Sequence, residues 1–220
     1  LDGGVSTHLG STFEYRELWS SSLLLSKAGR QTILSGHRDW VNAGADVIST
    51  VTYQCHYEES LWPKGGVLSE FIVDQMWKDA IELAQQSCPK FVVASSGCYG
   101  AALSNGAEYT GEYGQVTLEK LEEFHRHKFL TVRKHSDNTL IAVETVPSLL
   151  ECQALRNLVL RNENFEAYIS LACRNQSELN DGTPLQQALE VFRDVPNNQL
   201  VAIGLNCCND RYLDSLLSIL

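Results

Sequence analysis

The chain has 220 residues, of which 44% are hydrophobic and 20% are charged, and its formal net charge is -10. This is an ordinary globular composition, and the chain is long enough to build one large core. No run of about 18 apolar residues occurs, so the sequence predicts no membrane-spanning helix, and no signal peptide is visible. The acidic balance disfavours nucleic acid as a partner, because an acidic surface repels phosphate backbones.

Short apolar runs of strand type alternate along the chain with longer runs of helical periodicity. Leu1 is interpreted as the last residue of a strand, because Asp2, Gly3 and Gly4 follow as a turn. Five further strands are predicted at Ala45–Thr50, Phe91–Ser95, Thr139–Glu144, Ala167–Cys173 and Leu200–Asn206. Their nearly continuous hydrophobicity is typical of parallel strands that are covered on both faces.

Amphipathic helices are predicted between these strands, where apolar side chains recur at helical spacing. The clearest examples are Ile33–Val41, Phe71–Leu83, Leu118–Phe124 and Leu213–Leu220. Ser148 is expected to cap one more helix, with Glu151 closing a capping box three residues later. His125 and His127 do not face each other on a helix, so we interpret them as part of a solvated helix face and not as metal ligands.

This order is a βα unit repeated about six times, without a linker or low-complexity segment. We therefore predict one domain over residues 1–220, in the α/β class with a parallel sheet. Doubly wound sheets and (β/α)8 barrels both agree with the pattern, and a barrel usually has about 250 residues and eight units. Six units and an end inside a helix favour a TIM-type barrel that is incomplete in this chain, and we expect two further units beyond residue 220.

Polar residues follow each predicted strand, at the ends where the active sites of both folds gather. Glu144 ends a purely apolar run, so its carboxylate needs a cation or hydrogen-bond donors. A structural salt bridge and a ligand contact are both open for Glu144, and Asp2 could either cap its turn or bind a ligand amine. Two carboxylates at one barrel mouth suit a substrate with an ammonium group, such as an amino acid.

The seven cysteines are an odd number without a regular framework. Most lie in or beside apolar runs, which favours a reducing compartment over a disulfide scaffold, so we expect a cytoplasmic protein. Cys207 follows the last predicted strand, and a lone cysteine there is most often a small buried hydrophobe. Cys207 and Cys208 point to opposite faces of a strand, so they do not naturally chelate a metal together.

Two loops between predicted elements remain. The segment from Ser96 to Gly100 is glycine-rich but lacks a dinucleotide-binding fingerprint, and no helix is expected directly after its strand. The segment from Glu108 to Gly114 lies in a long connection between a strand and a helix. Its aromatic residues favour a lid over a variable surface loop.

Eight short segments run in order across essentially the whole chain: Leu1–Gly4, Leu18–Ser20, Ala43–Ile48, Thr50–Gln54, Glu108–Tyr113, Glu144–Pro147, Asp181–Pro184 and Gly204–Cys207. Taken together they resemble the homocysteine S-methyltransferase family. Each segment alone is weak, but the ordered set is specific. It is most similar to the members that use S-methylmethionine or S-adenosylmethionine as methyl donor.

The resemblance implies a (β/α)8 barrel that transfers a methyl group from a sulfonium donor to the thiol of L-homocysteine, forming methionine. It also implies a Zn²⁺ ion held by three cysteines, the first of which maps to Cys207. The other two belong to a Gly-Gly-Cys-Cys motif that this chain lacks, and we expect them outside it. Cys98 is a second departure, because relatives usually carry proline at this position.

The resemblance further implies which residues bind homocysteine. The amino-acid group would be held by Asp2, Gly3 and Glu144. The pocket would be lined by Thr50 and Tyr53, and Asn206 would lie beside the metal. Two alternatives stay open: a barrel lyase or aldolase that uses Glu144 as a general base, and a degenerate barrel without catalysis. The sequence does not determine the methyl donor or the oligomeric state.

Overall fold

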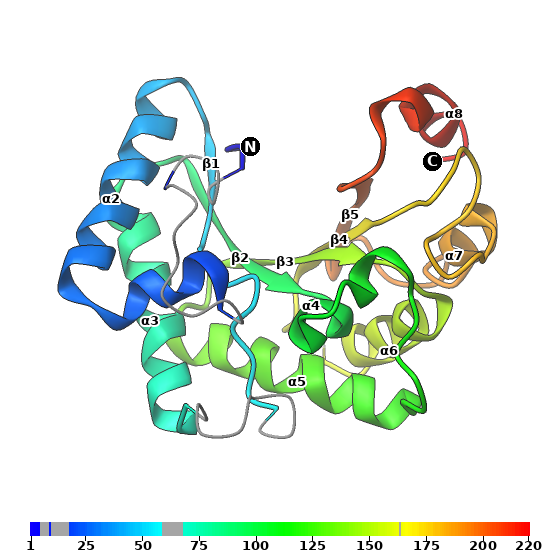
Figure 1. The fold of residues 1–220 in the computed structure, drawn as a ribbon, viewed down its shortest axis with the longest axis horizontal. Coiled ribbons are helices and arrows are strands. Elements are labelled where there is room, and N and C mark those ends of the chain that lie inside the picture. The colour runs from blue at the N-terminus through cyan, green and yellow to red at the C-terminus, as the bar shows by residue number, and fades with distance from the viewer. Residues whose placement is uncertain (5–8, 10–17, 59–67, 163) are drawn as a thin grey trace. The chain divides into compact units, whose positions relative to one another are not determined.

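The structure of this chain is a computed structural model that describes residues 1–4, 9, 18–58, 68–162 and 164–220. The chain divides into two compact units, and each is described by itself. The first consists of Leu1–Ser96 with Leu130–Leu140, and the second of Gly97–Phe129 with Ile141–Leu220. Figure 1 shows the elements of both. The single domain over residues 1–220 stays a prediction.

In the first unit, two parallel strands are accompanied by helices. The elements are the 3-10 helix η1 (Trp19–Leu25), α2 (Lys27–Asn42), β1 (Val47–Ser49), α3 (Glu70–Gln86) and β2 (Phe91–Gly97). β1 pairs with β2 in parallel, with Ile48 opposite Val92. α2 and α3 each follow a capping serine, because the side chain of Ser26 accepts from the N–H of Gly29 and that of Ser69 from the N–H of Ile72.

In the second unit, three parallel strands alternate with helices. The elements are α4 (Tyr99–Leu103), the 3-10 helix η3 (Ala107–Tyr109), α5 (Leu118–His135), β3 (Leu140–Val146), α6 (Leu149–Leu160), β4 (Ala167–Leu171), α7 (Leu185–Glu190), β5 (Leu200–Leu205), the 3-10 helix η4 (Asp210–Tyr212) and α8 (Leu213–Leu217). The strand order is β3-β4-β5, and Ile169 of β4 lies between Val143 and Ile203. The last turns of α5 and residue 140 belong to the first unit.

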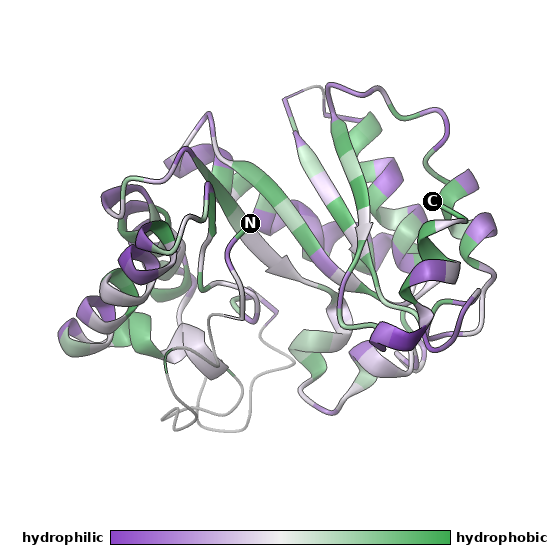
Figure 2. Cartoon of the chain, turned by 90° about the horizontal axis from the view of Figure 1, so that it is seen from above, coloured by the Kyte–Doolittle hydropathy of each residue, from purple (hydrophilic) through white to green (hydrophobic). Residues whose placement is uncertain are grey.

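The strands of the second unit differ in how well they are covered. Ile141, Val143, Ile169 and Leu171 are fully buried in β3 and β4, as expected for strands covered on both faces. In β5, by contrast, Val201 is 47% exposed. Figure 2 shows the apolar colouring that runs along the strands. The predicted coverage therefore holds for β3 and β4 but not for β5.

The alternation of parallel strands and helices agrees with the predicted α/β class, and the predicted strands at Ala45–Thr50 and beyond all form, within a few residues. Two local predictions need correction. No strand is assigned at Leu1, although the N–H of Asp2 donates to the carbonyl of Val47 at 2.9 Å. A helix does follow β2 at once, since α4 begins at Tyr99. Its first amide is satisfied by the distant carboxylate of Glu151, at 2.7 Å, which the local sequence does not reveal.

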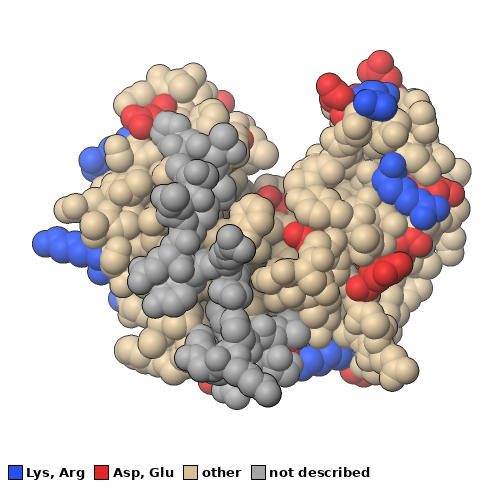
Figure 3. All heavy atoms as spheres, in the orientation of Figure 1, with Lys and Arg blue, Asp and Glu red and all other residues tan. Residues whose placement is uncertain are grey.

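The surface of the second unit carries mixed charges. On the face drawn in Figure 3, basic side chains of this unit stand beside acidic ones. Arg161 pairs with Glu122 and Arg174 with Glu178. Exposed pairs of this kind contribute only about 0–1 kcal/mol each. No helix in the described ranges is long and apolar enough to cross a membrane.

His37 of α2 makes the stability of the first unit depend on pH. Its side chain is fully buried, neither ring nitrogen has a hydrogen-bond partner among the described residues, and burial lowers its pKa to about 4. Because the unfolded pKa is about 6.5, the unfolded chain binds the proton first, and stability falls as the pH drops below 6.5. Between pH 7.5 and 5.0 we expect His37 to account for a loss of about 2 kcal/mol.

Urea unfolding of the wild type and of His37→Leu at both pH values measures this loss. The wild type should lose about 2 kcal/mol more than the variant. Equal losses in the wild type and in His37→Leu would contradict the prediction.

Candidate functional site

Two strand ends in the second unit are held together by the side chain of Asn206. Its Oδ1 accepts from the N–H of Thr145 at 2.9 Å, and its Nδ2 donates to Thr145 Oγ1 at 2.8 Å. Thr145 and Cys207 both adopt left-handed backbone conformations, with φ of 63° and 51°. Such conformations cost about 1–3 kcal/mol each in residues other than glycine and persist only where surrounding contacts impose them. The ends of β3 and β5 therefore store strain, as functional sites often do.

The thiol of Cys207 lies within this arrangement. Thr145 Oγ1 donates to Cys207 Sγ at 3.8 Å, and Asn206 Nδ2 lies 3.7 Å from the same sulfur. Although the residue is exposed, the atoms packed around its sulfur desolvate it and raise its pKa, and the charges of Glu144 and Glu108 raise it further. Because these negative charges disfavour the thiolate, a cation bound near the sulfur would favour it.

The structure thus brings together three of the residues singled out in the sequence. Glu144 lies half-buried near the end of β3, and Asn206 and Cys207 follow β5. They meet because β3, β4 and β5 are parallel, so that their carboxyl ends lie at the same edge. The expectation that the chemistry takes place at these strand ends stays a prediction.

Cys208 does not join Cys207. Its Sγ accepts from the N–H of Cys173 at 3.2 Å and donates to the carbonyl oxygen of Asn206. Hydrogen bonds from Cys173 lower the pKa of Cys208 to about 7. No group of three or more His, Cys, Asp or Glu residues that could hold a metal ion occurs in the described part of the chain. Cys207 has the donor chemistry of a zinc ligand, but the residues around it do not complete a three-cysteine site.

Two residues of the loop after α4 interact electrostatically with Cys207, and the sequence did not single them out as site residues. Burial raises the pKa of Tyr109, and the charges of Cys207 and Glu108 raise it further, while the charge of Glu108 also raises the pKa of Cys207. The loop is held in place, because Asn180 Nδ2 donates to the carbonyl of Glu108 at 2.9 Å. At Gly111, with φ of 72°, an added Cβ would lie 2.6 Å from Asp181 Cβ. These contacts fix the segment that was expected to be a lid.

The same loop is anchored at its other end by a buried carboxylate. Glu151 is fully buried and accepts from the N–H of Tyr99 at 2.7 Å, from His125 Nε2 at 2.8 Å and from the hydroxyl of Tyr113. Burial lowers the pKa of His125, so the ring is neutral near pH 7 and can donate from Nε2. The three donors come from α4, α5 and the loop.

Two sequence interpretations change as a result. His125 is not on a solvated helix face, because its side chain is fully buried, whereas His127 is exposed and pairs with Glu123. Ser148 does cap α6, accepting from the N–H of Glu151 at 3.4 Å. The side chain of Glu151, however, binds Tyr99, His125 and Tyr113, where a capping box would direct it to the backbone of Ser148.

The other predicted site residues belong to the first unit. Asp2 accepts from the N–H of Ser49 at 2.9 Å and from its hydroxyl at 2.8 Å, and burial nevertheless raises the pKa of Asp2. Gly3 has no room for a side chain, because an added Cβ would lie 2.5 Å from the ring of Trp40. Asp2 therefore orients the end of β1, and Gly3 permits a close approach to α2.

Thr50 and Tyr53 follow β1 directly. Thr50 is buried, and its Oγ1 lies 2.6 Å from Thr52 Oγ1 and accepts from the N–H of Ser95. Tyr53 is half-buried in the turn that comes next. The hydroxyl of Thr50 thus connects the ends of β1 and β2, and its role in lining a pocket stays a prediction.

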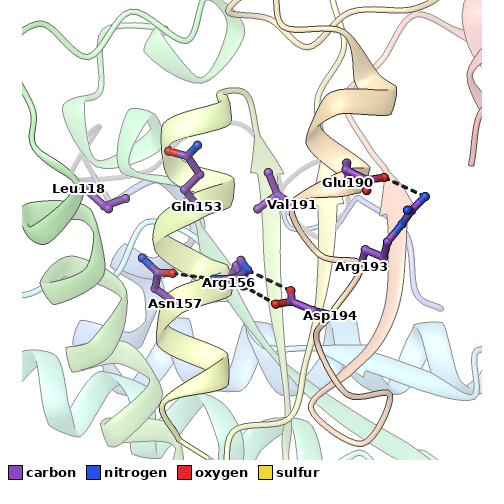
Figure 4. Close-up of a pocket in the computed structure, with 8 residues that line it drawn as sticks. All are labelled: Leu118, Gln153, Arg156, Asn157, Glu190, Val191, Arg193 and Asp194. Atoms are coloured by element: carbon purple, nitrogen blue, oxygen red, sulfur yellow. Dashed lines mark hydrogen bonds and ion pairs between the residues drawn. The ribbon is translucent and has the colours of Figure 1, made fainter.

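Two clefts of the second unit lie outside the Cys207 cluster. A cleft of about 520 Å³ is lined by residues of α5, α6 and the end of α7. The pair Arg156–Asp194 joins α6 to the segment after α7, and Arg193 pairs with Glu190 on one side (Figure 4). The charged side chains in these two ion pairs neutralise one another, so the cleft offers neither an acidic nor a basic group to a charged ligand. A second cleft, of about 370 Å³, is lined by the loop at Tyr109 and by residues 174, 180 and 181.

Comparisons with known proteins place the chain among methyltransferases. Residues 1–220 match the family model described as homocysteine S-methyltransferase. The chain is 32% identical to homocysteine S-methyltransferase 1 of Brassica oleracea var. italica, covering 99% of this chain and 70% of that protein. It is 30% identical to the selenocysteine Se-methyltransferase of the same plant, covering 99% of this chain and 67% of that protein.

A solved structure is similar over nearly the whole chain. The metallated form of the homocysteine methyltransferase MmuM from Escherichia coli matches with a TM-score of 0.85 and 29% sequence identity. The match covers 99% of this chain and 77% of that one. The predicted fold, a TIM-type barrel that is incomplete in this chain, is confirmed by this similarity.

The bridge made by Asn206 can be tested by its removal. In Asn206→Ala the buried N–H of Thr145 loses its acceptor, so we expect the free energy of unfolding to fall by about 1–3 kcal/mol. Urea unfolding measures the change. Asn198→Ala, at an exposed site, should stay within about 0.5 kcal/mol of the wild type. Equal stability of the two variants would show that the bridge contributes nothing.

The anchor between Tyr113 and Glu151 gives a second prediction. Tyr113→Phe removes the hydroxyl that donates to Glu151, so one buried carboxylate oxygen loses its donor. We expect the free energy of unfolding to fall by about 1–3 kcal/mol. The loop from Glu108 to Gly114 should then be cleaved faster by a protease under native conditions, as followed by mass spectrometry of the products. Tyr212→Phe, in η4, is the control. Unchanged cleavage in Tyr113→Phe would mean that other contacts suffice to hold the loop.

Proposed function

The chain belongs to the homocysteine S-methyltransferase family, and we propose that it transfers a methyl group from a sulfonium donor to the thiol of L-homocysteine, forming methionine. The donor in this proposal is S-methylmethionine or S-adenosylmethionine. One observation supports these strand ends as the place of the reaction. Glu144, Asn206 and Cys207 lie together there, with the strained backbone of Thr145 between them.

The chemistry needs a thiolate and a dry site. The new bond joins the homocysteine sulfur to the methyl carbon, and the bond from that carbon to the donor sulfur breaks, leaving its electron pair on the departing thioether. The thiol proton must leave first, and only a few per cent of a free thiol with a pKa of about 8.5 is ionised at pH 7. Because a thiolate and a sulfonium become two neutral thioethers, exclusion of water lowers the barrier.

We propose Zn²⁺ as the cofactor, with Cys207 as one ligand. A bound zinc ion keeps a coordinated thiol deprotonated near neutral pH. A three-cysteine site needs two thiolates beyond Cys207, so they would have to come from residues other than those that the structure groups around it. Asn206 and Thr145 would then orient the sulfur of Cys207 through the contacts that they already make.

The amino-acid part of homocysteine would be bound by carboxylates and backbone, as the family resemblance implies. We propose Glu144, Asp2 and Gly3 as these residues, with Thr50 and Tyr53 lining the pocket and Asn206 beside the metal. The hydrogen bonds from Ser49 to Asp2 support a fixed orientation of that carboxylate. None of these side chains has to transfer a proton, since their role is positioning.

The chain in this proposal is the homocysteine-binding barrel domain of a cytoplasmic enzyme. Its seven free thiols suit a reducing compartment. The similarity to a selenocysteine Se-methyltransferase makes selenocysteine the acceptor to compare with homocysteine. A lyase or aldolase that uses Glu144 as a general base would depend on neither acceptor.

The test is methionine formation by the full-length protein. Homocysteine and selenocysteine are offered as acceptors, and S-methylmethionine and S-adenosylmethionine as donors, with and without a zinc chelator. Turnover with homocysteine that the chelator abolishes supports the proposal and identifies the donor. Absence of methylation with every pair, in a folded protein that contains zinc, would overturn it.

Cys207→Ser is the sharpest variant. Serine is a poorer zinc ligand than cysteine, so we expect kcat/KM for homocysteine to fall by roughly 100-fold or more, with loss of bound zinc by elemental analysis. The exposed thiol at Cys88 provides the control, and Cys88→Ser should stay within about twofold of the wild type. Retained zinc and activity in Cys207→Ser would refute the metal assignment.

A further inference from the structure

The smaller cleft of the second unit has the size and the lining of a small-molecule site. It measures about 370 Å³ and is lined by the loop at residues 109–112 and by residues 174, 180 and 181, and we call it the Arg174 cleft. This volume is within the range of sites for small ligands. The side chain of Tyr109 is 55% exposed at the cleft, so the apolar part of a ligand could cover an aromatic ring.

The guanidinium of Arg174 is held along one edge and leaves its other edge to a ligand. Its Nε and Nη2 donate to Glu178 Oε2 at 3.0 and 2.7 Å, and its remaining N–H groups have no acceptor among the described residues. The group packs against Gly182, where an added Cβ would lie 3.0 Å from Nη2. A guanidinium has five N–H donors in one plane, so the three that remain can bind a carboxylate through two parallel hydrogen bonds.

A carboxylate without a cation lines the same cleft. The side chain of Glu112 makes no hydrogen bond or ion pair with any residue that the structure describes. The carboxylate of Asp181, by contrast, already accepts from the N–H groups of Thr183 and Leu149, both at 2.8 Å. The Arg174 cleft therefore offers a ligand donors from one positive group and acceptors from one negative group. This combination suits the carboxylate and the ammonium group of an α-amino acid.

The Arg174 cleft lies at the carboxyl end of β4, the strand between β3 and β5. On the β3 side, the N–H of Asp181 donates to the carbonyl of Pro147 at 3.0 Å. On the β5 side, the N–H of Cys173 donates to Cys208 Sγ at 3.2 Å, and Cys208 is the neighbour of Cys207 in the chain. Backbone contacts thus connect the walls of the cleft to the two strand ends that carry the proposed reacting site.

We propose that the Arg174 cleft binds the α-amino-acid end of the methyl donor, with Arg174 at its carboxylate and Glu112 at its ammonium group. This inference rests on the proposed function, in which both candidate donors carry such an end. Two methylene groups separate that end from the sulfonium, so a donor held in the cleft would direct its methyl group toward a sulfur bound at Cys207. The amino-acid end of homocysteine stays with the residues proposed for it above.

The test uses donors that lack one of the two charged groups. S-methylmethionine has a decarboxylated analogue, (3-aminopropyl)dimethylsulfonium, and a deaminated analogue, 4-(dimethylsulfonio)butanoate. If S-adenosylmethionine is the donor that supports turnover, its decarboxylated and deaminated forms take their place. Calorimetry on the full-length protein without homocysteine gives a Kd for each ligand. The ratio of the Kd values of the analogue and the donor measures what the missing group contributes to binding.

In Arg174→Met, which removes the charge and keeps the length of the side chain, the preference for the donor over its decarboxylated analogue should fall about tenfold. The preference over the deaminated analogue should stay within about twofold. Glu112→Gln should show the reverse, with a loss of about threefold, because water screens this exposed carboxylate. Arg126→Met, which removes an exposed arginine paired with Glu123 on α5, is the matched control and should change neither ratio.

Unchanged ratios in Arg174→Met, or an equal weakening of all three ligands, would overturn the inference. The second result would mean that loss of the pair with Glu178 only disturbs the fold, which affects each ligand alike. In turnover assays, the KM for the donor should rise in Arg174→Met while the KM for homocysteine stays within about twofold. A rise in the KM for homocysteine alone would assign the cleft to the acceptor and overturn the inference as well.

Failure of the proposed function is separate, since it appears as a wild type that forms no methionine. The binding ratios are read without homocysteine and do not depend on turnover.

Discussion

The second unit depends on one buried carboxylate. Glu151 accepts hydrogen bonds from the start of α4, from His125 of α5 and from Tyr113 at the end of the loop that carries Glu108. A fully buried charge is stable only if its acceptors are satisfied, so the three donors must keep their positions for the carboxylate to remain there. The position of the loop thus follows from a group that is itself no part of the proposed site.

Around Cys207 the molecule combines backbone strain with negative charge. The left-handed conformations of Thr145 and Cys207 are unfavourable by themselves, and the amide of Asn206 compensates part of that cost by satisfying both the backbone and the hydroxyl of Thr145. Glu144 and Glu108 then make the surroundings of the sulfur a place where positive charge is favoured. Methyl transfer from a sulfonium is a reaction in which a positive charge arrives and disappears.

The two carboxylates come from different parts of the fold. Glu144 ends a strand of the parallel sheet, where active sites of this fold gather. Glu108 comes from a loop that is fixed by Asn180 and by the close packing on Gly100. In the proposal, the residue on the strand positions the acceptor.

The sequence by itself determined the alternation of strands and helices, because buried parallel strands and amphipathic helices have different hydrophobic periods. It also determined that Glu144, Asn206 and Cys207 lie at strand ends, since each follows an apolar run. It did not reveal His125 as buried, α4 as a helix, or the loop at Glu108 as fixed by a distant side chain. Only the tertiary structure decided these, because each depends on a partner far along the chain: Glu151 for His125 and Tyr99, and Asn180 for Glu108. Local periodicity carries no information about such contacts.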